Sequence, residues 1–194
     1  MALIIQKFGG TSVGTLERIR RVAEIISETR QAGHDVVVVV SAMSGETDRL
    51  IQMANQISAN PNAREYDALV STGECVSAAL LAMALEEKGI SACSLTGRQA
   101  RVFTTQAHRR AHITHISVDA IKGLLAENKI PVVTGFQGVN AMGDVTTLER
   151  GGSDTSAVAL AAALKADECQ IYTDVAGVPP NFWMMSAITI ILVF

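Results

Sequence analysis

Val36-Val37-Val38-Val39-Val40 is the stretch that decides the fold of this chain. A strand made of five valines has no polar face, so it has to be covered on both sides. Strands of this kind occur in parallel sheets, where helices pack on both faces. The run therefore predicts the centre of a mostly parallel sheet in an α/β protein.

The rest of the chain alternates between short apolar runs and helical patterns. Three further strands are expected at Leu3–Ile5, Val132–Val133 and Ile171–Tyr172. Helices are expected from Leu16 to Gly33, from Glu74 to Lys88, from Val118 to Asn128 after a Ser117 cap, and after Asp154. This alternation is typical of α/β folds. It predicts helices on both faces of one parallel sheet.

Composition places the chain among globular proteins of about one domain. Its 194 residues are 48% apolar and 18% charged, which is enough for one sizeable core. The net charge is −3 and no run of lysine or arginine exceeds two residues, so no nucleic-acid partner is expected. Three isolated cysteines favour a reducing, cytoplasmic location. The chain opens as a strand rather than as a signal peptide.

The last part of the chain departs from this pattern. From Pro179 onward the charged residues disappear, and residues 184–194 are nearly all apolar. That run is shorter than the roughly 20 residues that span a bilayer, so no membrane partner is expected. Residues 179–194 are expected to be a divergent apolar tail that arises from truncation or a change of reading frame. A buried edge strand is the alternative.

The stretch best suited to ligand binding is Leu148-Glu149-Arg150-Gly151-Gly152-Ser153-Asp154-Thr155-Ser156. Two glycines allow a tight turn, and the small hydroxyl and acidic residues after them are typical of a helix start. The unpaired amides of a helix start bind anions, and the planar fork of Arg150 suits a carboxylate. Asp154 repels an anion unless it meets a cation. The stretch therefore predicts a ligand that carries an ammonium group or a metal as well as a negative charge.

Five other short polar segments follow predicted strands or begin predicted helices. They are Lys7–Ser12, Ser41–Gly45, Ser71–Glu74, Gly135–Gly138 and Thr173-Asp174. Taken singly, each is as readily an ordinary turn as a binding loop. Loops at the carboxyl ends of parallel strands meet at one edge of the sheet, where ligands bind. The collection therefore predicts one pocket that several distant segments share.

His108, His112 and His115 have the spacing of metal ligands on one helix face. No cysteine or carboxylate completes such a set, and Arg109 and Arg110 lie between the histidines. A solvent-exposed face is the favoured interpretation, and no protein metal site is assigned.

Six motifs, in order, resemble those of aspartate kinases in the amino acid kinase superfamily. They are Lys7-Phe8-Gly9-Gly10-Thr11-Ser12, Ser41-Ala42-Met43, Ser71-Thr72-Gly73-Glu74, Gly135-Phe136-Gln137-Gly138, Arg150-Gly151-Gly152-Ser153-Asp154-Thr155 and Tyr172-Thr173-Asp174-Val175. The resemblance covers about residues 2 to 178. It implies a truncated three-layer α/β/α sandwich of the amino acid kinase or carbamate kinase type. Residues 1–178 would be an incomplete catalytic domain, without the ACT regulatory domains of the family.

The resemblance implies transfer of the γ-phosphoryl group of ATP to the side-chain carboxylate of L-aspartate, with Mg²⁺ carried by the ATP. The product would be 4-phospho-L-aspartate, the first intermediate towards lysine (through diaminopimelate), threonine and methionine. An aspartate side chain has a pKa of about 3.9, so it is ionised at neutral pH and needs no general base. Positioning and positive charge then have to bring two anions together.

The resemblance also implies roles for individual residues. Lys7 and Asp154 are the implied catalytic residues: Lys7 neutralises the transferring phosphoryl group, and Asp154 faces the substrate ammonium or holds a lysine. The implied ATP and phosphate site is Lys7, Phe8, Gly9, Gly10, Thr173, Asp174, Gly177 and Val178, with the amides of Gly9 and Gly10 as donors. The implied aspartate site is Ser41, Thr47, Glu74, Arg150, Gly151, Gly152, Ser153 and Asp154, with Glu74 on the ammonium and Arg150 on the α-carboxylate.

The sequence departs from the family after Val178. Pro179-Pro180-Asn181-Phe182-Trp183 stands where the family has a tyrosine and then an Asp-Pro-Arg element, and a second phosphate-facing lysine is missing. We expect the chain to keep the aspartate half of the site, with weak nucleotide binding and little or no turnover. A homo-oligomer, or association with a longer kinase chain, is the expected assembly.

Other functions are weighed against this one. A catalytically silent fragment that binds aspartate and associates with a full-length partner is the main alternative. Another kinase of the superfamily, acting on glutamate, acetylglutamate or UMP, is the second. A nicotinamide-binding Rossmann enzyme is disfavoured, because no Gly-x-Gly-x-x-Gly follows a predicted strand.

Overall fold

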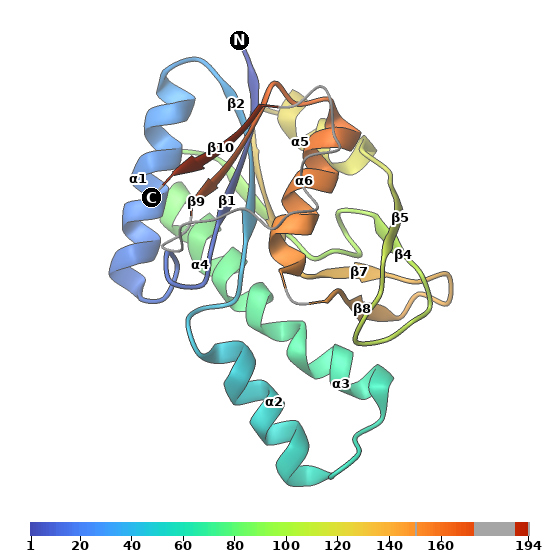
Figure 1. Cartoon of the computed structure of the whole chain (residues 1–194). Coiled ribbons are helices and arrows are strands. Elements are labelled where there is room, and N and C mark those ends of the chain that lie inside the picture. The colour runs from blue at the N-terminus through green and yellow to red at the C-terminus, as the bar shows by residue number, and fades with distance from the viewer. Residues whose placement is uncertain (150, 173–188, 194) are drawn as a thin grey trace.

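The computed structural model describes residues 1–149, 151–172 and 189–193. A six-stranded parallel sheet lies at its centre, in the order β10-β9-β1-β2-β6-β3 (Figure 1). Its strands are β1 (Leu3–Phe8), β2 (Asp35–Val40), β3 (Ala92–Leu95), β6 (Ile130–Thr134), β9 (Glu168–Tyr172) and β10 (Thr189–Val193). A four-stranded sheet in the order β5-β4-β7-β8 lies to one side. Its strands are β4 (Val102–Thr104), β5 (Ile113–Ile116), β7 (Gln137–Val139) and β8 (Val145–Thr147).

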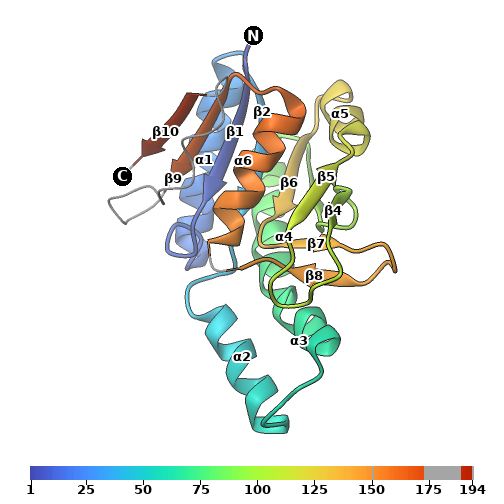
Figure 2. The same ribbon diagram turned by 45° about the vertical axis from the view of Figure 1, so that its right-hand side comes forward.

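Helices cover both faces of the large sheet (Figure 2). On one face lie α1 (Leu16–Gln31) and α4 (Thr72–Glu87), and on the other lie α5 (Asp119–Ala126) and α6 (Gly152–Leu164). This arrangement confirms the predicted three-layer α/β/α sandwich with a mostly parallel central sheet.

Strand β2 contributes side chains to the hydrophobic cores on both faces of the large sheet. Its five valines are fully buried: Val36, Val38 and Val40 face α1 and α4, whereas Val37 and Val39 face α6. The strand pairs in parallel with β1 and β6, and Val38 lies opposite Gln6 and Val132. The valine run is therefore the centre of the sheet, because a strand without a polar face is stable only between two covering layers.

Two helix starts differ from the expectations. Helix α5 begins at Asp119, and the Ser117 hydroxyl donates to the Asp119 carboxylate (3.1 Å) instead of capping the helix. The N-cap residue is Val118, so Ser117 lies one position too early for a capping bond. Helix α6 begins at Gly152, before Asp154, because Gly151 takes the left-handed conformation (φ 80°) that turns the chain into the helix.

Two helices between β2 and α4 were not predicted. They are α2 (Glu46–Ile57) and α3 (Ala63–Val70), which extend below the sandwich in Figure 1. Only Leu50 and Ala54 of α2 are buried. Helix α3 begins after Asn62, whose side chain accepts hydrogen bonds from the amides of Arg64 and Glu65.

The stretch from Ala63 to Glu87 is long and apolar enough to cross a membrane by length and composition alone, and half of its 18-residue apolar window is buried inside the fold. It is divided between α3 and α4, with Ser71 between them. The buried residues of α4 pack in the core formed with α1 and the sheet. Core packing therefore explains the apolar composition of this window.

Part of the apolar tail forms a strand. Strand β10 pairs in parallel with β9 at the edge of the large sheet, with Thr189 opposite Glu168 and Val193 opposite Tyr172. This pairing favours the edge-strand alternative for residues 189–193. Residues 179–188 and 194 lie outside the described part of the chain.

A glycine at the junction of the two sheets allows a close backbone contact. A Cβ atom added to Gly97 would lie 2.4 Å from the carbonyl oxygen of Gln137, a backbone atom that cannot move aside. We expect Gly97→Ala to lower the free energy of unfolding by about 1–3 kcal/mol, as overpacking does. Gly123→Ala is the control, because Gly123 lies in helix α5 with no atom near its added Cβ.

The Gly123→Ala variant should be more stable than the parent by about 0.5–1 kcal/mol, because alanine has the higher helix propensity. Urea unfolding followed by circular dichroism measures both changes. Equal stability of the two variants would show that the close contact at Gly97 is not maintained in solution.

Candidate functional site

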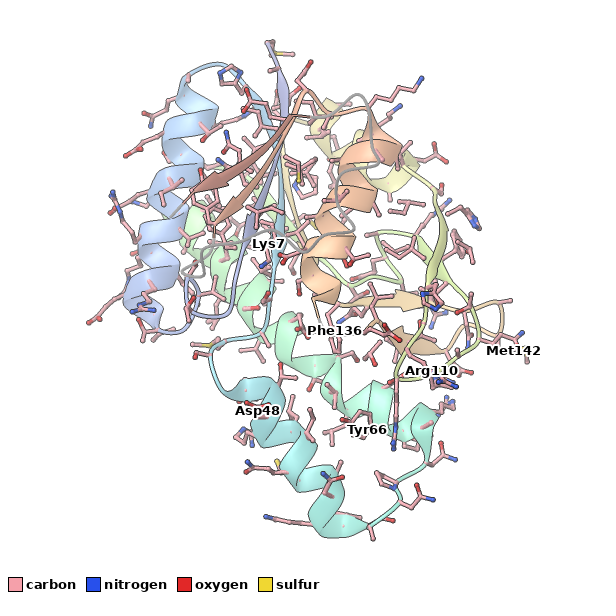
Figure 3. The ribbon with its side chains drawn as sticks, in the orientation of Figure 1. Lys7, Asp48, Tyr66, Arg110, Phe136 and Met142 are labelled. Atoms are coloured by element: carbon pink, nitrogen blue, oxygen red, sulfur yellow. The ribbon has the colours of Figure 1, made fainter. Side chains whose placement is uncertain are left out.

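A cavity of about 800 Å³ lies at the carboxyl ends of β1 and β2, between the sheet edge and helices α2 and α3. Figure 3 labels four of the residues that line it: Lys7, Asp48, Tyr66 and Phe136. Ten of the predicted site residues line it: Lys7, Gly9, Gly10, Ser41, Thr47, Glu74, Gly151, Gly152, Ser153 and Asp154. They come from the end of β1, from the loops after β1 and β2, from the starts of α2 and α4, and from the N-cap and first turn of α6. The expectation that distant segments share one pocket is therefore confirmed for these residues.

Lys7 and Asp154 form an ion pair inside this cavity. The Lys7 Nζ atom lies 2.6 Å from Asp154 Oδ1, and the two side chains are 8% and 25% exposed. Lys7 extends from the buried strand β1, and Asp154 lies in the first turn of α6. The pair therefore fixes a lysine ammonium at the junction of the sheet edge and a helix start, where anions bind favourably.

The two glycines after β1 lie close to neighbouring segments of the cavity wall. A Cβ on Gly9 would lie 3.5 Å from Lys7 Nζ, and a Cβ on Gly10 would lie 3.0 Å from the Ala42 carbonyl oxygen. The Gly9 amide donates to the Tyr172 carbonyl (3.2 Å), so it is already used, contrary to the predicted role as a phosphate donor. The Gly10 amide has no partner among the described residues, so the donor role fits Gly10 better.

The start of α6 packs closely against the loop after β6. A Cβ on Gly135 would lie 2.8 Å from Ser153 Oγ, and a Cβ on Gly152 would lie 2.9 Å from the Phe136 ring. The Phe136 amide donates to Ser156 Oγ (3.1 Å), which ties the loop to the helix. These contacts place the first turn of α6 at the cavity wall.

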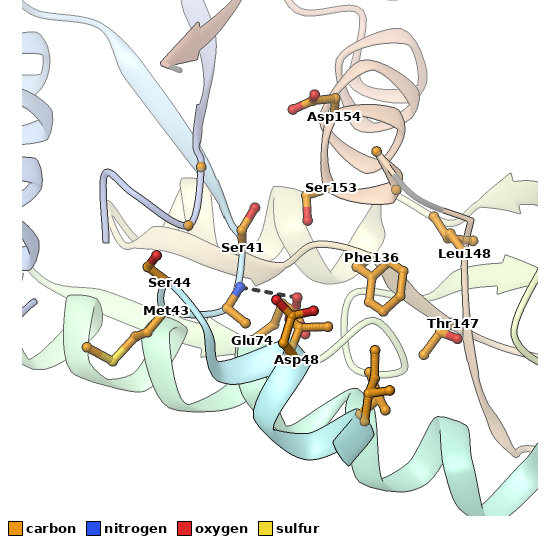
Figure 4. Close-up of a pocket in the computed structure, with 18 of the residues that line it drawn as sticks. Ser41, Met43, Ser44, Asp48, Glu74, Phe136, Thr147, Leu148, Ser153 and Asp154 are labelled. Atoms are coloured by element: carbon orange, nitrogen blue, oxygen red, sulfur yellow. Dashed lines mark hydrogen bonds between the residues drawn. The ribbon is translucent and has the colours of Figure 1, made fainter. Parts of the chain in front are cut away.

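Glu74 is an acid buried in the cavity wall, 3% exposed. Its Oε1 atom accepts a hydrogen bond from the Ala42 amide (3.1 Å), shown by the dashed line in Figure 4. Its Oε2 atom is buried and has no hydrogen-bond partner among the described residues. Burial raises the pKa of the Glu74 carboxyl to about 7. An ammonium group in the cavity would satisfy Oε2 and stabilise the ionised carboxylate.

Six predicted site residues are not placed in the cavity. Arg150, Thr173, Asp174, Gly177 and Val178 lie outside the described residues. Phe8 is fully buried and does not line the cavity; its ring stacks on Tyr172 at 4.5 Å between centroids. Because alternate residues of a strand face opposite ways, Phe8 points into the α1 core while Lys7 points to the ligand side.

Several lining residues were not predicted as site residues. They include Asp48 and Ile51 of α2, Tyr66 and Val70 of α3, Arg109, Phe136, Thr147 and Leu148. Figure 4 shows Asp48, Phe136 and Thr147 beside Glu74 in the same cavity. Phe136 lies within a recognised motif, whereas the residues of α2 and α3 lie on the two helices that the sequence pattern did not reveal.

The interpretation of the histidines as a solvent-exposed face holds for His112 and His115, which are exposed, but not for His108. They do not share a helix: His108 precedes β5, and His115 lies in β5 and stacks on Phe103. His108 is not part of a solvent-exposed face either, since its side chain is 18% exposed and its Nδ1 atom lies 2.8 Å from the fully buried Asp67 carboxylate. No group of three metal-binding side chains occurs in the part of the chain that the structure describes.

Comparison with known proteins is consistent with this geometry. The sequence model of the Amino acid kinase family matches residues 2–181. An aspartokinase of Pseudomonas aeruginosa is 63% identical over 178 residues, which is 92% of this chain and 43% of that protein. An aspartokinase of Geobacillus stearothermophilus is 59% identical over 92% of this chain and 44% of its own length. The chain thus spans less than half the length of these curated relatives.

Solved structures show the same fold. The crystal structure of an aspartate kinase from Synechocystis superposes with a TM-score of 0.78 at 56% identity, over 91% of this chain and 29% of that one. Aspartokinase III of E. coli, in complex with aspartate and ADP, superposes with a TM-score of 0.76 at 26% identity, over 91% of this chain and 50% of that one.

Proposed function

The chain belongs to the amino acid kinase family, and we propose that it carries the aspartate-binding site of an aspartate kinase. The reaction is transfer of the γ-phosphoryl group of ATP to the side-chain carboxylate of L-aspartate, which yields 4-phospho-L-aspartate. The observation that carries the proposal is the convergence of Lys7, Glu74 and Asp154, from three distant segments, on one cavity. The aspartokinases to which the chain is similar support it.

The cavity suits this reaction because it supplies charge rather than a base. The aspartate carboxylate is already ionised at neutral pH, since its pKa is about 3.9. Lys7 offsets the repulsion between this carboxylate and the phosphoryl group, and Asp154 holds the Lys7 ammonium in place through the 2.6 Å ion pair. Positioning and electrostatic stabilisation are the main contributions a protein makes to phosphoryl transfer.

The phosphate end of ATP fits beside Lys7. Gly10 offers an amide without a partner among the described residues, and the absence of a Cβ on Gly9 keeps the space beside Lys7 Nζ free. Magnesium carried by ATP supplies further positive charge to the phosphate oxygens. Thr173, Asp174, Gly177 and Val178 are proposed for the rest of the nucleotide site by resemblance.

Glu74 fits the ammonium group of L-aspartate. Its buried Oε2 atom needs a donor, and an ammonium group offers three. Ser41, Thr47 and Ser153 line the same cavity and offer hydroxyl groups to the substrate. Arg150 is proposed, by resemblance, to bind the α-carboxylate, which would complete recognition of all three charged groups of L-aspartate.

The cellular role is proposed on the same basis. The reaction would begin the synthesis of lysine through diaminopimelate, of threonine and of methionine, in the cytoplasm. Residues 1–178 are proposed as the catalytic domain, which acts as a homo-oligomer or with a longer kinase chain. Because residues 179–183 replace the family's Asp-Pro-Arg element, the chain by itself is expected to bind aspartate better than it turns it over.

Calorimetry tests the proposal with the chain as it is. We expect saturable binding of L-aspartate, and binding of L-glutamate, N-acetylglutamate and UMP at least about tenfold weaker, because the polar groups of the cavity would be mispaired. Trapping of aspartyl phosphate with hydroxylamine in the presence of MgATP then measures turnover. Tighter binding of one of the other substrates would assign the chain to a different kinase of the family.

A further inference from the structure

Among the described residues, the cavity is lined by two cations, Lys7 and Arg109, and by three acids, Asp48, Glu74 and Asp154. Lys7 is paired with Asp154 at 2.6 Å, so its charge is largely balanced before a ligand binds. Arg109 also lines the cavity, and it forms no ion pair with any residue that the structure describes. Its side chain is exposed, which places its positive charge at the mouth of the cavity rather than at its base. Arg109 is therefore the lining cation best able to act on an anion that is still in solution.

The Arg109 side chain is held in position by its neighbours. Its guanidinium lies over the Tyr66 ring, 4.2 Å from the ring centroid, and its Nη2 atom donates to the Pro61 carbonyl at 2.7 Å. Both contacts use only part of the guanidinium, which has five N–H donors. Because the side chain is already ordered, little conformational entropy is lost when the remaining donors meet an anion.

The Arg109 backbone is fixed by a buried acid. Its amide donates to both carboxylate oxygens of Asp67 (3.1 and 3.0 Å), and its φ of 66° shows that it occupies a left-handed turn. The same carboxylate accepts bonds from the Thr147 amide (3.1 Å) and hydroxyl (2.6 Å). Asp67 thus joins the Arg109 turn to helix α3 and strand β8, and both of these contribute residues to the cavity wall.

From this arrangement we propose that Arg109 captures small carboxylate ligands at the mouth of the cavity. Arg109 does not lie at the reacting groups, because Tyr66, on which it stacks, lies on α3 away from Lys7 and the sheet edge (Figure 3). A charge at the rim of a site acts mainly on the association rate and on its dependence on salt. The inference rests on the proposed function only in naming L-aspartate as the natural ligand.

The test compares two neighbouring arginines by calorimetry. Arg109→Gln and Arg110→Gln remove the same charge, but Arg110 is exposed and does not line the cavity (Figure 3). The probes are L-aspartate and succinate, each at about 10 mM and about 500 mM salt, where the screening length is roughly 30 Å and 4 Å. We expect Arg109→Gln to weaken binding about three- to tenfold at low salt and less than about twofold at high salt. Arg110→Gln should bind both probes with the affinity of the parent at both salt concentrations.

Tyr66→Leu provides a second variant that keeps the charge. Loss of the ring should weaken low-salt binding about two- to threefold, since Arg109 is no longer held by a cation–π contact. Equal effects of Arg109→Gln and Arg110→Gln, or an Arg109 effect that is the same at both salt concentrations, would overturn the inference.

Succinate separates the failure of this inference from the failure of the proposed function, because it lacks the ammonium group that Glu74 is proposed to bind. One outcome is that succinate binds in a salt-dependent way that requires Arg109, whereas aspartate does not bind. This result would support the Arg109 capture site and refute the proposed aspartate site. Absence of binding by both ligands would refute both.

Discussion

Replacement of Asp67 by alanine is expected to lower the free energy of unfolding by about 3–5 kcal/mol, the cost of removing one partner from a buried polar network. The Asp67 carboxylate has no exposed surface and accepts hydrogen bonds from the amides of Arg109 and Thr147 and from the Thr147 hydroxyl. The His108 ring contacts it as well, at 2.8 Å. Without the carboxylate these donors lose their acceptor inside the protein, where each unpaired group costs about 1–3 kcal/mol.

Glu65→Ala is the matched control for Asp67→Ala. Glu65 lies on the same helix, α3, is exposed, and pairs with the exposed Arg64. Its removal should change stability by less than about 1 kcal/mol, as for surface ion pairs in general. Urea unfolding followed by circular dichroism measures both variants. A loss of less than about 1 kcal/mol for Asp67→Ala would show that Asp67 does not join the three elements in solution.

Glu74→Gln should have opposite effects on binding and on stability. The variant keeps an oxygen for the Ala42 amide but loses the charge proposed to meet the substrate ammonium. Aspartate binding is therefore expected to weaken about 10- to 100-fold, the range for hydrogen bonds to charged groups.

Gln137, also buried, hydrogen-bonds the Gly97 amide and the Ser71 carbonyl and lies outside the cavity lining. A conservative substitution of Gln137 is the control, and calorimetry should show that it leaves the affinity for L-aspartate unchanged.

The pH dependence follows from the raised pKa of Glu74, about 7. The ionised fraction rises from about 0.1 at pH 6 to about 0.9 at pH 8, so the parent should bind aspartate about tenfold more tightly at pH 8. The Glu74→Gln variant should show no such change between these pH values. An equal pH dependence in parent and variant would contradict the assignment of Glu74 to the ammonium.

The stability of the protein should fall as the pH rises, whereas its affinity for aspartate should increase. A carboxyl whose pKa is raised from 4.5 to about 7 by folding contributes its full stability below pH 4.5, and this is lost as the pH rises through 7. The free energy of unfolding of the parent should fall over this range. At pH 8, Glu74→Gln should be more stable by up to about 3 kcal/mol, since each pKa unit corresponds to about 1.4 kcal/mol. The two proteins should converge below pH 4.5.

Parts of the fold could be predicted because they rest on local chemistry. The valines at 36–40 leave no polar face, so their position at the sheet centre follows from the sequence alone. Gly10, Gly151 and Gly152 lie where the backbone has to turn or approach a neighbour closely, and this is why the glycine-rich segments indicated the cavity. The ligand-binding edge then follows from the parallel order of the strands.

Other parts could not be predicted because they depend on contacts between distant residues. Asp67 meets Arg109 and Thr147 across 42 and 80 positions of the chain, and nothing in the local sequence pairs them. Helix α2 is an exception, because Leu50, Ala54 and Ile57 recur at helical spacing and could have indicated it. The strands of the small sheet have three or four residues each, which is too short for an alternating pattern to be recognised.

The central claim is that loops from distant parts of the chain form one aspartate-binding cavity, and chemical-shift mapping tests it most directly. L-Aspartate added to ¹⁵N-labelled protein should shift the amide resonances of Gly10, Ala42, Glu74, Phe136 and Ser153 together, with a single dissociation constant. These residues belong to five different segments of the chain and all line the cavity. Shifts confined to one of these segments, or located on a different surface, would contradict the account.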